Sequence, residues 1–205
     1  MNYHNITYPD MNNGDGLRVV LWLSGCSHHC YNCQNPQTWD ANSGIPFDES
    51  AKKELFRELD KDYISGLTLT GGDPLFESNL DGVLDLVTEF NKRYNFQKVN
   101  SANPCKMGVS EVENTDKIRL SLPNKSIWIY SGFRWSEIFN DSVYLTKDCA
   151  GWKRREIVKQ CTVMVDGKYI DSQRNPSKKW AGSDNQRVID IRKSLEQNKI
   201  ILYCD

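Results

Sequence analysis

The chain has 205 residues, 39% of them hydrophobic and 26% charged, a composition typical of a globular protein with enough length for one core. The 26 basic and 27 acidic residues give a formal net charge of −1, so no overall field draws the protein to nucleic acid or to anionic lipid. The longest apolar run, residues 19–23, is too short to cross a bilayer, and the first residues show no secretory pattern, so we expect a cytoplasmic protein without a membrane segment.

Short apolar segments rich in β-branched and aromatic residues predict four strands, at residues 18–24, 66–70, 126–131 and 161–165. Apolar residues at helical spacing predict helices between them: one that opens at Asp48, one over 79–90 and a short one around 135–139. Strands that alternate with helices favour a parallel sheet of βαβ units. A complete eight-stranded barrel needs about 250 residues, so the expected fold class is α/β, with a partial, open parallel β/α barrel.

Two stretches interrupt this alternation. Residues 97–122 are polar and lack a sustained period, which predicts a surface segment inserted into a single domain that spans residues 1–205. Residues 141–159 form a second, partly helical elaboration. Its basic cluster, 153–155, is interpreted as a solvated helix face, with a local anionic contact as the alternative.

Polar or glycine-rich motifs follow the end of each predicted strand. They are Cys26, the turn 71–73, the pair 131–132 and the turn 166–168. Because the carboxyl ends of parallel strands build the site in α/β folds, these motifs are expected to face one cavity.

Cys26, Cys30 and Cys33 form a CxxxCxxC motif on one loop. Seven cysteines, an odd number, in a reducing compartment indicate a metal site or catalysis rather than a disulfide framework. Three thiolates can hold three corners of a cubane iron–sulfur cluster. The remaining cysteines are distant in sequence, and an iron without a protein ligand is free to bind a small molecule.

A zinc site with three cysteines and either His28 or His29 is the alternative use of this loop. The CxxxCxxC spacing makes it less favourable, because the loop already folds Cys26 and Cys30 onto one metal centre. Adjacent histidines between them are awkward ligands. They are interpreted as loop residues.

The CxxxCxxC motif beyond a first strand resembles the radical S-adenosylmethionine enzymes. The sequence as a whole is similar to one branch of them, the activating enzymes of anaerobic (class III) ribonucleotide reductase. The similar segments are residues 1–16, 24–39, 67–76, 127–133, 163–169 and 180–187, with 188–203 similar to the C-terminal strands of that family. The sequence departs from the family pattern at Asp15, where a proline is usual, at Thr162, where aspartate is frequent, and in the extra segment 97–122.

The resemblance implies a fold of the radical S-adenosylmethionine type in which Cys26, Cys30 and Cys33 ligate a [4Fe-4S] cluster. S-adenosyl-L-methionine would chelate the remaining iron and contact Asn32, Cys33, Gln34 and Gly72. Its reductive cleavage would generate a glycyl radical on the catalytic subunit of anaerobic ribonucleotide reductase. A reduced donor such as flavodoxin would supply the electron, and no nucleic acid would be bound directly.

Two other classes of function stay open at this stage. One is another small radical S-adenosylmethionine enzyme, similar to the pyruvate formate-lyase activase or to 7-carboxy-7-deazaguanine synthase. The other is a zinc-binding nucleic-acid module, which the neutral charge and the βα organisation disfavour.

Residues 180–187 have too many small and hydrogen-bonding side chains for a core strand. Either these side chains cap turns and satisfy buried backbone groups, or the segment lies at the cavity mouth, where Asn185 and Arg187 would meet the partner or the ligand. The mouth is favoured because the segment follows the fourth predicted strand.

Overall fold

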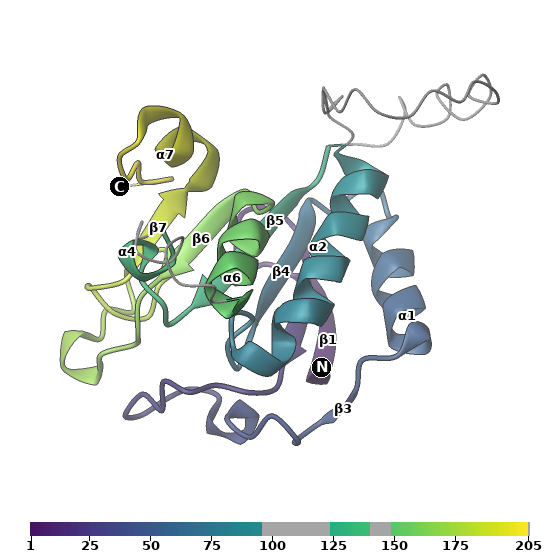
Figure 1. Cartoon of the computed structure of the whole chain (residues 1–205), viewed down its shortest axis with the longest axis horizontal. Coiled ribbons are helices and arrows are strands. Elements are labelled where there is room, and N and C mark those ends of the chain that lie inside the picture. The colour runs from purple at the N-terminus through teal and green to yellow at the C-terminus, as the bar shows by residue number, and fades with distance from the viewer. Residues whose placement is uncertain (96–123, 140–148, 205) are drawn as a thin grey trace.

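A computed structural model describes residues 1–95, 124–139 and 149–204. The expected insertion at 97–122, with Cys105, and residues 141–148 of the second elaboration lie outside these ranges. A seven-stranded sheet organises the described part of the chain (Figure 1). Its strands are β1 (Asn2–Asp10), β2 (Arg18–Leu23), β3 (Ile45–Pro46), β4 (Gly66–Gly71), β5 (Ser126–Ser131), β6 (Val163–Asp166) and β7 (Arg187–Asp190). The helices are α1 (Glu49–Leu59), α2 (Leu80–Tyr94), α4 (Trp135–Ile138), α6 (Cys149–Lys159) and α7 (Ile191–Gln197). Short 3-10 turns occupy Pro36–Thr38, Glu77–Asn79 and Asp171–Gln173.

The spatial order of the strands is β3-β1-β2-β4-β5-β6-β7, and the sheet is open. Strands β2, β4, β5 and β6 are parallel, as predicted. The flanking strands β1, β3 and β7 run antiparallel to their neighbours, which the sequence analysis does not foresee. The fold is therefore a mixed α/β sheet with a parallel centre, and the expectation of a wholly parallel sheet holds only for that centre.

The predicted strands 18–24, 66–70 and 126–131 are confirmed to within one residue, and the fourth begins two residues later than predicted, at Val163. The helix expected at Asp48 is confirmed. The carboxylate of Asp48 accepts hydrogen bonds from the N–H groups of Ser50 and Ala51, a cap that contributes about 1 kcal/mol. The end of the chain differs from the expected strands. Asp190 caps α7 by accepting from the N–H of Lys193, so the chain turns into a helix directly after β7.

The two faces of the sheet have different tasks. Side chains alternate along each strand, and one set packs under α1, α2 and α6, which cover the same face in Figure 1. This set includes Val19, Leu21, Leu23, Leu67, Leu69, Ile127 and Ile129, all with 0% exposure. The opposite face carries a second cluster around Trp128. The face covered by the helices therefore holds the main hydrophobic core, and the opposite face holds the smaller cluster around Trp128.

Arg18 lies on that opposite face at the amino-terminal ends of the central strands and is fully buried. Its guanidinium donates to Thr68 Oγ1 at 2.6 Å and to the carbonyl oxygens of Leu67 at 2.6 Å and Ser126 at 3.0 Å. It also lies over the ring of Trp128, 5.4 Å from the centroid. Burial lowers the pKa of Arg18 to about 10, which leaves it charged at neutral pH. Arg18 therefore ties the starts of β2, β4 and β5 together.

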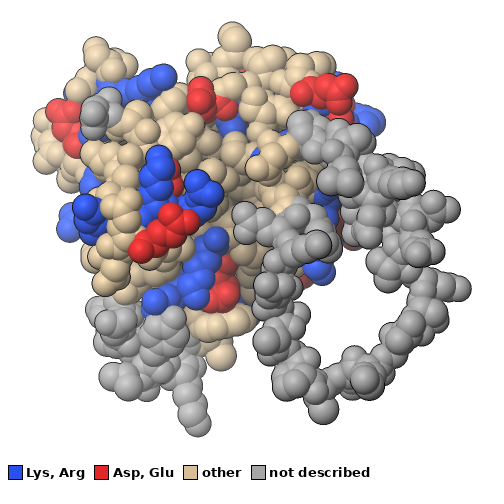
Figure 2. Space-filling model, turned by 90° about the horizontal axis from the view of Figure 1, so that it is seen from above, with Lys and Arg blue, Asp and Glu red and all other residues tan. Residues whose placement is uncertain are grey.

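No helix in the described ranges is long and apolar enough to cross a membrane. On the face shown in Figure 2, basic and acidic side chains lie next to one another, without a broad area of one sign. This mixture agrees with the near-neutral composition.

Candidate functional site

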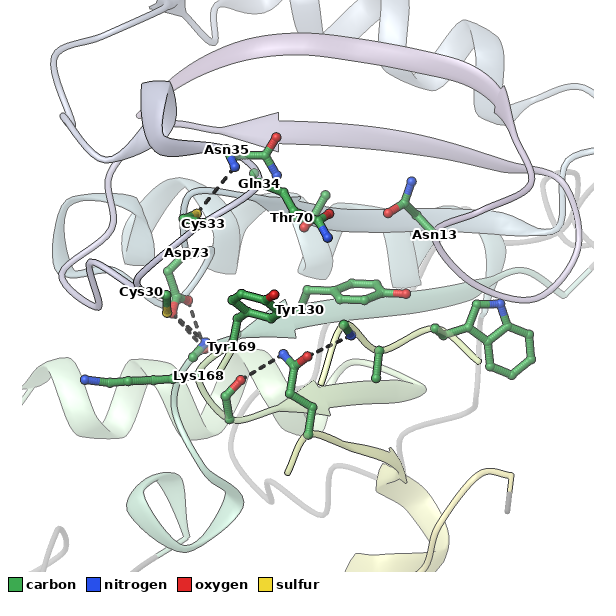
Figure 3. A pocket seen from close by; sticks show the side chains of 18 of the residues that line it. Asn13, Cys30, Cys33, Gln34, Asn35, Thr70, Asp73, Tyr130, Lys168 and Tyr169 are labelled. Carbon is green, nitrogen blue, oxygen red and sulfur yellow. Dashed lines mark hydrogen bonds between the residues drawn. The ribbon is translucent and has the colours of Figure 1, made fainter. Parts of the chain in front are cut away.

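A cavity of about 900 Å³ opens at the carboxyl ends of the parallel strands. All four motifs contribute to its wall, as the sequence analysis predicts. The lining residues at or beyond the carboxyl ends of β2, β4, β5 and β6 include Cys26, His28, Cys30, Cys33, Gln34, Gly71, Gly72, Asp73, Ser131, Gly132, Gly167, Lys168 and Tyr169. Residues 11–13 and 176–182 complete the wall, and Figure 3 shows Cys30 and Cys33 toward one end and Asn13 toward the other.

The cysteine loop is fixed by backbone hydrogen bonds at its base. The N–H of Gly25 donates to the carbonyl of Thr38 at 2.7 Å, and that of Cys26 donates to Trp39 at 3.0 Å. Within the loop, the N–H of Cys33 donates to the carbonyl of Cys30 at 3.1 Å. His29 and Asn32 have φ values of 47° and 53°. Histidine and asparagine enter this left-handed region more readily than most residues, so the loop can turn sharply between the cysteines.

The three thiols are free and partly exposed. Burial raises the pKa of the Cys26 thiol to about 11 and is the largest influence on it, while the backbone N–H groups of His28 and His29 lower it. Burial also raises the pKa of Cys30, which the backbone N–H of Tyr169 and the charge of Lys168 lower. Amide donors thus approach these sulfurs, as in sites that hold thiolates.

The donor set fits an iron–sulfur cluster. In the described residues, no three His, Cys, Asp or Glu side chains are close enough to hold a single metal ion. In a cubane, each cysteine ligates its own iron, so the sulfurs do not have to converge on one point. The N–H of Asn35 approaches Cys33 Sγ at 3.4 Å, so an amide also faces the third thiol. Soft ligands surrounded by amide donors are suited to such a cluster.

The Gly71-Gly72 turn brings β4 against the cysteine loop. A Cβ atom on Gly72 would lie 2.5 Å from the carbonyl oxygen of Gly25 and 2.9 Å from that of Thr38. Gly71 has a φ of +104°, which favours glycine. Both glycines line the cavity, and the contact between two backbone segments requires them even before a ligand is considered.

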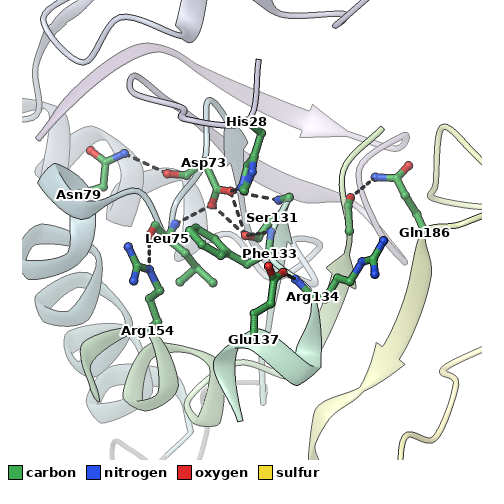
Figure 4. Close-up of polar contacts among 12 residues, drawn as sticks. His28, Asp73, Leu75, Asn79, Ser131, Phe133, Arg134, Glu137, Arg154 and Gln186 are labelled. Atoms are coloured by element: carbon green, nitrogen blue, oxygen red, sulfur yellow. Dashed lines mark hydrogen bonds and ion pairs between the residues drawn. The ribbon is translucent and has the colours of Figure 1, made fainter. Parts of the chain in front are cut away.

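Asp73 connects three strand ends through one buried carboxylate, which is 1% exposed (Figure 4). It lies 2.7 Å from His28 Nε2, accepts from Ser131 Oγ at 2.9 and 3.0 Å, and accepts from the N–H of Gly132 at 3.0 Å. It also accepts from the N–H of Leu75 at 2.8 Å. From the sequence, the turn 71–73 is expected to face the cavity and His28 is interpreted as a loop residue, but no contact between Asp73 and His28 is expected. The one available signal was that each follows a central strand.

The predicted contacts to S-adenosylmethionine occupy different places. Cys33, Gln34 and Gly72 line the cavity. Asn32 is exposed and lies outside the residues that line it.

The segment 180–187 borders the cavity through Trp180, Ala181, Gly182 and Gln186. Arg187 is not part of the wall. Its guanidinium binds the buried carboxylate of Asp166, with Nε 3.0 Å from Oδ1 and Nη2 2.5 Å from Oδ2. Asn185 donates to the carbonyl of Lys168 at 2.8 Å. The side chains of Asn185 and Arg187 thus make internal contacts. Gln186 lines the cavity and is also held internally, since its Nε2 donates to the carbonyl of Gly167 at 3.0 Å and its Oε1 accepts from the N–H of Gly182 at 2.9 Å.

Comparison with known proteins agrees with this arrangement. The family model of a 4Fe-4S single cluster domain matches residues 12–109 and 103–189. The chain is 36% identical over 189 residues to the anaerobic ribonucleoside-triphosphate reductase-activating protein of Enterobacteria phage T4, covering 92% of this chain and 93% of that protein. It is 31% identical over 194 residues to the protein of the same name from Escherichia coli, covering 94% and 100%. The corresponding protein of Pasteurella multocida is 30% identical over 190 residues, covering 92% and 96%.

Proposed function

This chain belongs to the family of anaerobic ribonucleoside-triphosphate reductase-activating proteins, and on that premise we propose that it activates an anaerobic ribonucleoside-triphosphate reductase. The activation is the formation of a glycyl radical on the catalytic subunit of that reductase. A reduced donor such as flavodoxin supplies the electron, and the reaction takes place in the cytoplasm. The open sheet serves as a partial barrel of the radical S-adenosylmethionine type, within a single domain over residues 1–205 that carries a surface insertion at 97–122.

The observation that carries the proposal is the position of Cys26, Cys30 and Cys33. Among the described residues, they are the only cysteines that line the cavity. Cys161, by contrast, is buried in the core. Cys26, Cys30 and Cys33 would hold a [4Fe-4S] cluster through their thiolates, and the bound cluster would supply the electron for reductive cleavage of S-adenosyl-L-methionine, the source of the radical chemistry on the partner's glycine. Because the pKa of Cys26 is raised to about 11, binding of the cluster displaces its proton.

The charge of the cavity suits a ligand with a carboxylate. Lys168, Lys178 and Lys179 line it. Asp73 is the one acidic residue in the lining of the described cavity, and it is 1% exposed and fully engaged in hydrogen bonds. We assign the contacts to S-adenosylmethionine to Cys33, Gln34 and Gly72, which line the cavity, and to Asn32, which precedes Cys33 on the cysteine loop.

The size of the cavity suits a second, larger reactant. It reaches from the cysteine loop to residues 11–13 and 176–182, which leaves room beside a nucleoside-sized ligand. We assign residues 176–182 to the mouth that admits the glycine-containing loop of the partner. The residues of this chain then orient the two reactants and exclude water.

The experiment that tests this function is an anaerobic activation assay. The protein, reconstituted with iron and sulfide and chemically reduced, is mixed with S-adenosylmethionine and the catalytic subunit of an anaerobic ribonucleotide reductase. We expect 5′-deoxyadenosine together with a glycyl-radical spectrum. Pyruvate formate-lyase, added in place of the reductase subunit, should give no radical. A radical on pyruvate formate-lyase alone, or cluster loading without 5′-deoxyadenosine, would contradict the proposal.

A further inference from the structure

We propose that Lys178, Lys179 and Trp180 recognise the protein partner: the indole of Trp180 packs against the incoming loop, and the two ammonium groups bind carboxylates of an acidic segment beside it. The identity of the partner rests on the proposed function. The arrangement of the three side chains is a property of the chain alone.

The loop that carries these residues is closed at its base. Arg174 and Ser183 form an isolated β-bridge, and the N–H of Asn175 donates to the carbonyl of Gly182 at 3.1 Å. Residues 176–182, which lie within the closed loop, all line the cavity. The loop therefore borders the cavity with a fixed backbone, and a partner that binds there loses little affinity to the ordering of this segment.

Trp180 has an unusual backbone conformation at this border. Its φ is 58°, in the left-handed region that bulky residues rarely adopt. Such conformations are costly and persist where the surrounding structure fixes them, often at binding sites. The indole meets Trp128 edge to face, with centroids 4.8 Å apart and planes at 74°, and lies 5.8 Å from the ring of Tyr203. Trp180 is nevertheless partly exposed and lines the cavity, so a fixed aromatic ring is left available to a partner.

The two lysines before Trp180 have no acidic partner. In the described residues, no carboxylate lies within ion-pair distance of Lys178 or Lys179. Lys178 Nζ donates to the backbone carbonyl of Asp184 at 2.7 Å, and Lys179 Nζ lies over the ring of Trp180, 4.1 Å from its centroid. Uncharged groups thus hold both ammonium groups in place without neutralising them. Carboxylates of a partner would form charge-assisted hydrogen bonds with them.

Trp180 lies near the end of the cavity that is remote from the cysteine loop. The hydroxyl of its neighbour Tyr203 donates to Asp15 Oδ2 at 3.2 Å, and Asp15 follows the wall residue Asn13 by two positions. Figure 3 shows Asn13 at the opposite end of the cavity from the labelled cysteines. The three side chains are therefore placed where a large reactant enters, and not at the site of the cluster.

The competing explanation is that the lysines bind the carboxylate of S-adenosylmethionine. Lys168 is better placed for that group, because Figure 3 shows it on the side of Cys30. Lys178 and Lys179 then remain for the partner. The two explanations differ in what loss of the charges changes: the KM for S-adenosylmethionine, or the Kd for the partner.

The variants separate the ring from the charges in the full chain. Trp180→Gly removes the indole, and glycine adopts the left-handed backbone without strain, whereas Trp180→Phe keeps an aromatic ring. A double variant, Lys178→Gln with Lys179→Gln, removes both charges. The controls are Trp152→Ala and Lys199→Gln. Both control residues are exposed, and neither lines the described cavity.

The measurement is the Kd for the full-length catalytic subunit of an anaerobic ribonucleotide reductase. The activating protein is reconstituted with iron and sulfide and saturated with S-adenosylmethionine. Binding is compared at about 0.1 M and about 1 M salt, between which the Debye length falls from about 10 to about 3 Å.

Trp180→Gly should raise the Kd about thirtyfold at both salt concentrations, because it removes an apolar contact, and Trp180→Phe should lie between it and the parent. The double lysine variant should raise the Kd about tenfold at the lower salt concentration and less than about twofold at the higher one, because salt already screens the attraction there. Both controls should bind like the parent. All variants should keep the parental KM for S-adenosylmethionine in the cleavage reaction without partner.

Several outcomes overturn the proposal. A parental Kd in folded Trp180→Gly would reduce the ring to internal packing, and a parental Kd in the double lysine variant at the lower salt concentration would exclude the acidic segment. A raised KM for S-adenosylmethionine with an unchanged Kd would assign the lysines to the small ligand. If Trp180→Gly does not fold, Trp180→Phe and the double lysine variant decide. Unchanged binding in every variant while the glycyl radical still forms refutes this inference alone, whereas an unsubstituted protein that neither binds the subunit nor forms the radical refutes the proposed function as well.

Discussion

His28 Nε2 and Asp73 Oδ2 lie 2.7 Å apart, although 45 positions separate the two residues along the chain. The contact joins the loop after β2 to the turn after β4. Because Asp73 also accepts from Ser131 and Gly132 after β5, one carboxylate links three neighbouring strand ends. Arg18 does the same at the opposite ends of these strands. Side-chain hydrogen bonds of Asp73 and Arg18 thus link the central strands at both of their ends. The cysteine loop is attached to these strands through His28.

Replacement of Cys26, Cys30 or Cys33 by alanine should abolish iron binding and cleavage of S-adenosylmethionine, because three thiolates are the minimum for the proposed cluster. Iron content and 5′-deoxyadenosine are the measurements. Alanine at Cys105, Cys149, Cys161 or Cys204 should leave both intact. Loss of iron from a folded Cys204 or Cys105 variant would mean a fourth protein ligand and exclude an open iron.

Gly72→Ala should destabilise the cluster-free protein by about 1–3 kcal/mol, because the new Cβ would lie 2.5 Å from the backbone carbonyl of Gly25. Gly82→Ala in α2 is the control. Its Cβ meets the flexible end of Met1, 2.8 Å from Sδ, and alanine gains about 0.5–1 kcal/mol of helix stability over glycine. Urea unfolding measures the free energy of unfolding of both variants. Equal effects of the two substitutions would show that the contact with Gly25 is not the constraint.

Arg187→Ala should lower the free energy of unfolding by about 2 kcal/mol, because it leaves the carboxylate of Asp166 without its charged partner. Asp166 is 1% exposed and, among the described residues, then keeps only the N–H of Trp135 as a donor, at 2.8 Å. The loss is moderate because the Arg187 side chain is 37% exposed and water replaces part of the ion pair. Lys193→Ala, which removes an exposed pair with Asp190, should cost under about 0.5 kcal/mol. Unchanged stability together with lost activation of the partner would instead assign Arg187 to the docking surface.

The buried thiol of Cys161 should make stability depend on pH in alkaline solution. Burial raises its pKa above the ordinary value of 9.0, so the folded state keeps its proton when the unfolded chain has lost it. The contribution of the protonated thiol to the free energy of unfolding is therefore complete below pH 9 and declines as the pH rises further. The stability of the parent relative to Cys161→Ala should fall by about 2 kcal/mol between pH 8 and pH 10.5. Urea unfolding at both values measures this, and a constant difference would mean that the thiol ionises normally in the folded protein.

The sequence is sufficient to predict the central strands and the site at their ends. Strands buried on both faces are continuous apolar runs, and residues 18–24 and 126–131 have this pattern. The cysteine loop is local in sequence, so its spacing alone indicates the cluster. Strand β1 is not predicted because Tyr3 and Ile6 are the only buried residues in this mostly polar segment.

The contacts that position the loop could not be predicted for a different reason. His28 and Asp73 have no periodic relation, and their contact depends on β2 and β4 being neighbours. Arg187 shows the same limit. A polar segment after β6 suggests a cavity mouth, but its pairing with Asp166 depends on the antiparallel register of β7 on β6.

The two ends of the sheet determine how this protein can associate with others. At one end, β3 consists of Ile45 and Pro46 and pairs only with Asn2 and Tyr3, so the rest of β1 has no strand on its outer side among the described residues. At the other end, residues 201–203 already pair with β7. The backbone N–H of Asp190 donates to the carbonyl of Ile201 at 2.9 Å, and the backbone N–H of Tyr203 donates to the carbonyl of Val188 at 2.8 Å. In the described structure, the β7 end is therefore closed to strand addition, whereas β1 beyond Tyr3 presents an open edge. Backbone pairing with another chain is thus confined to the β1 edge, whereas selection of a partner at the cavity mouth depends on the side chains there.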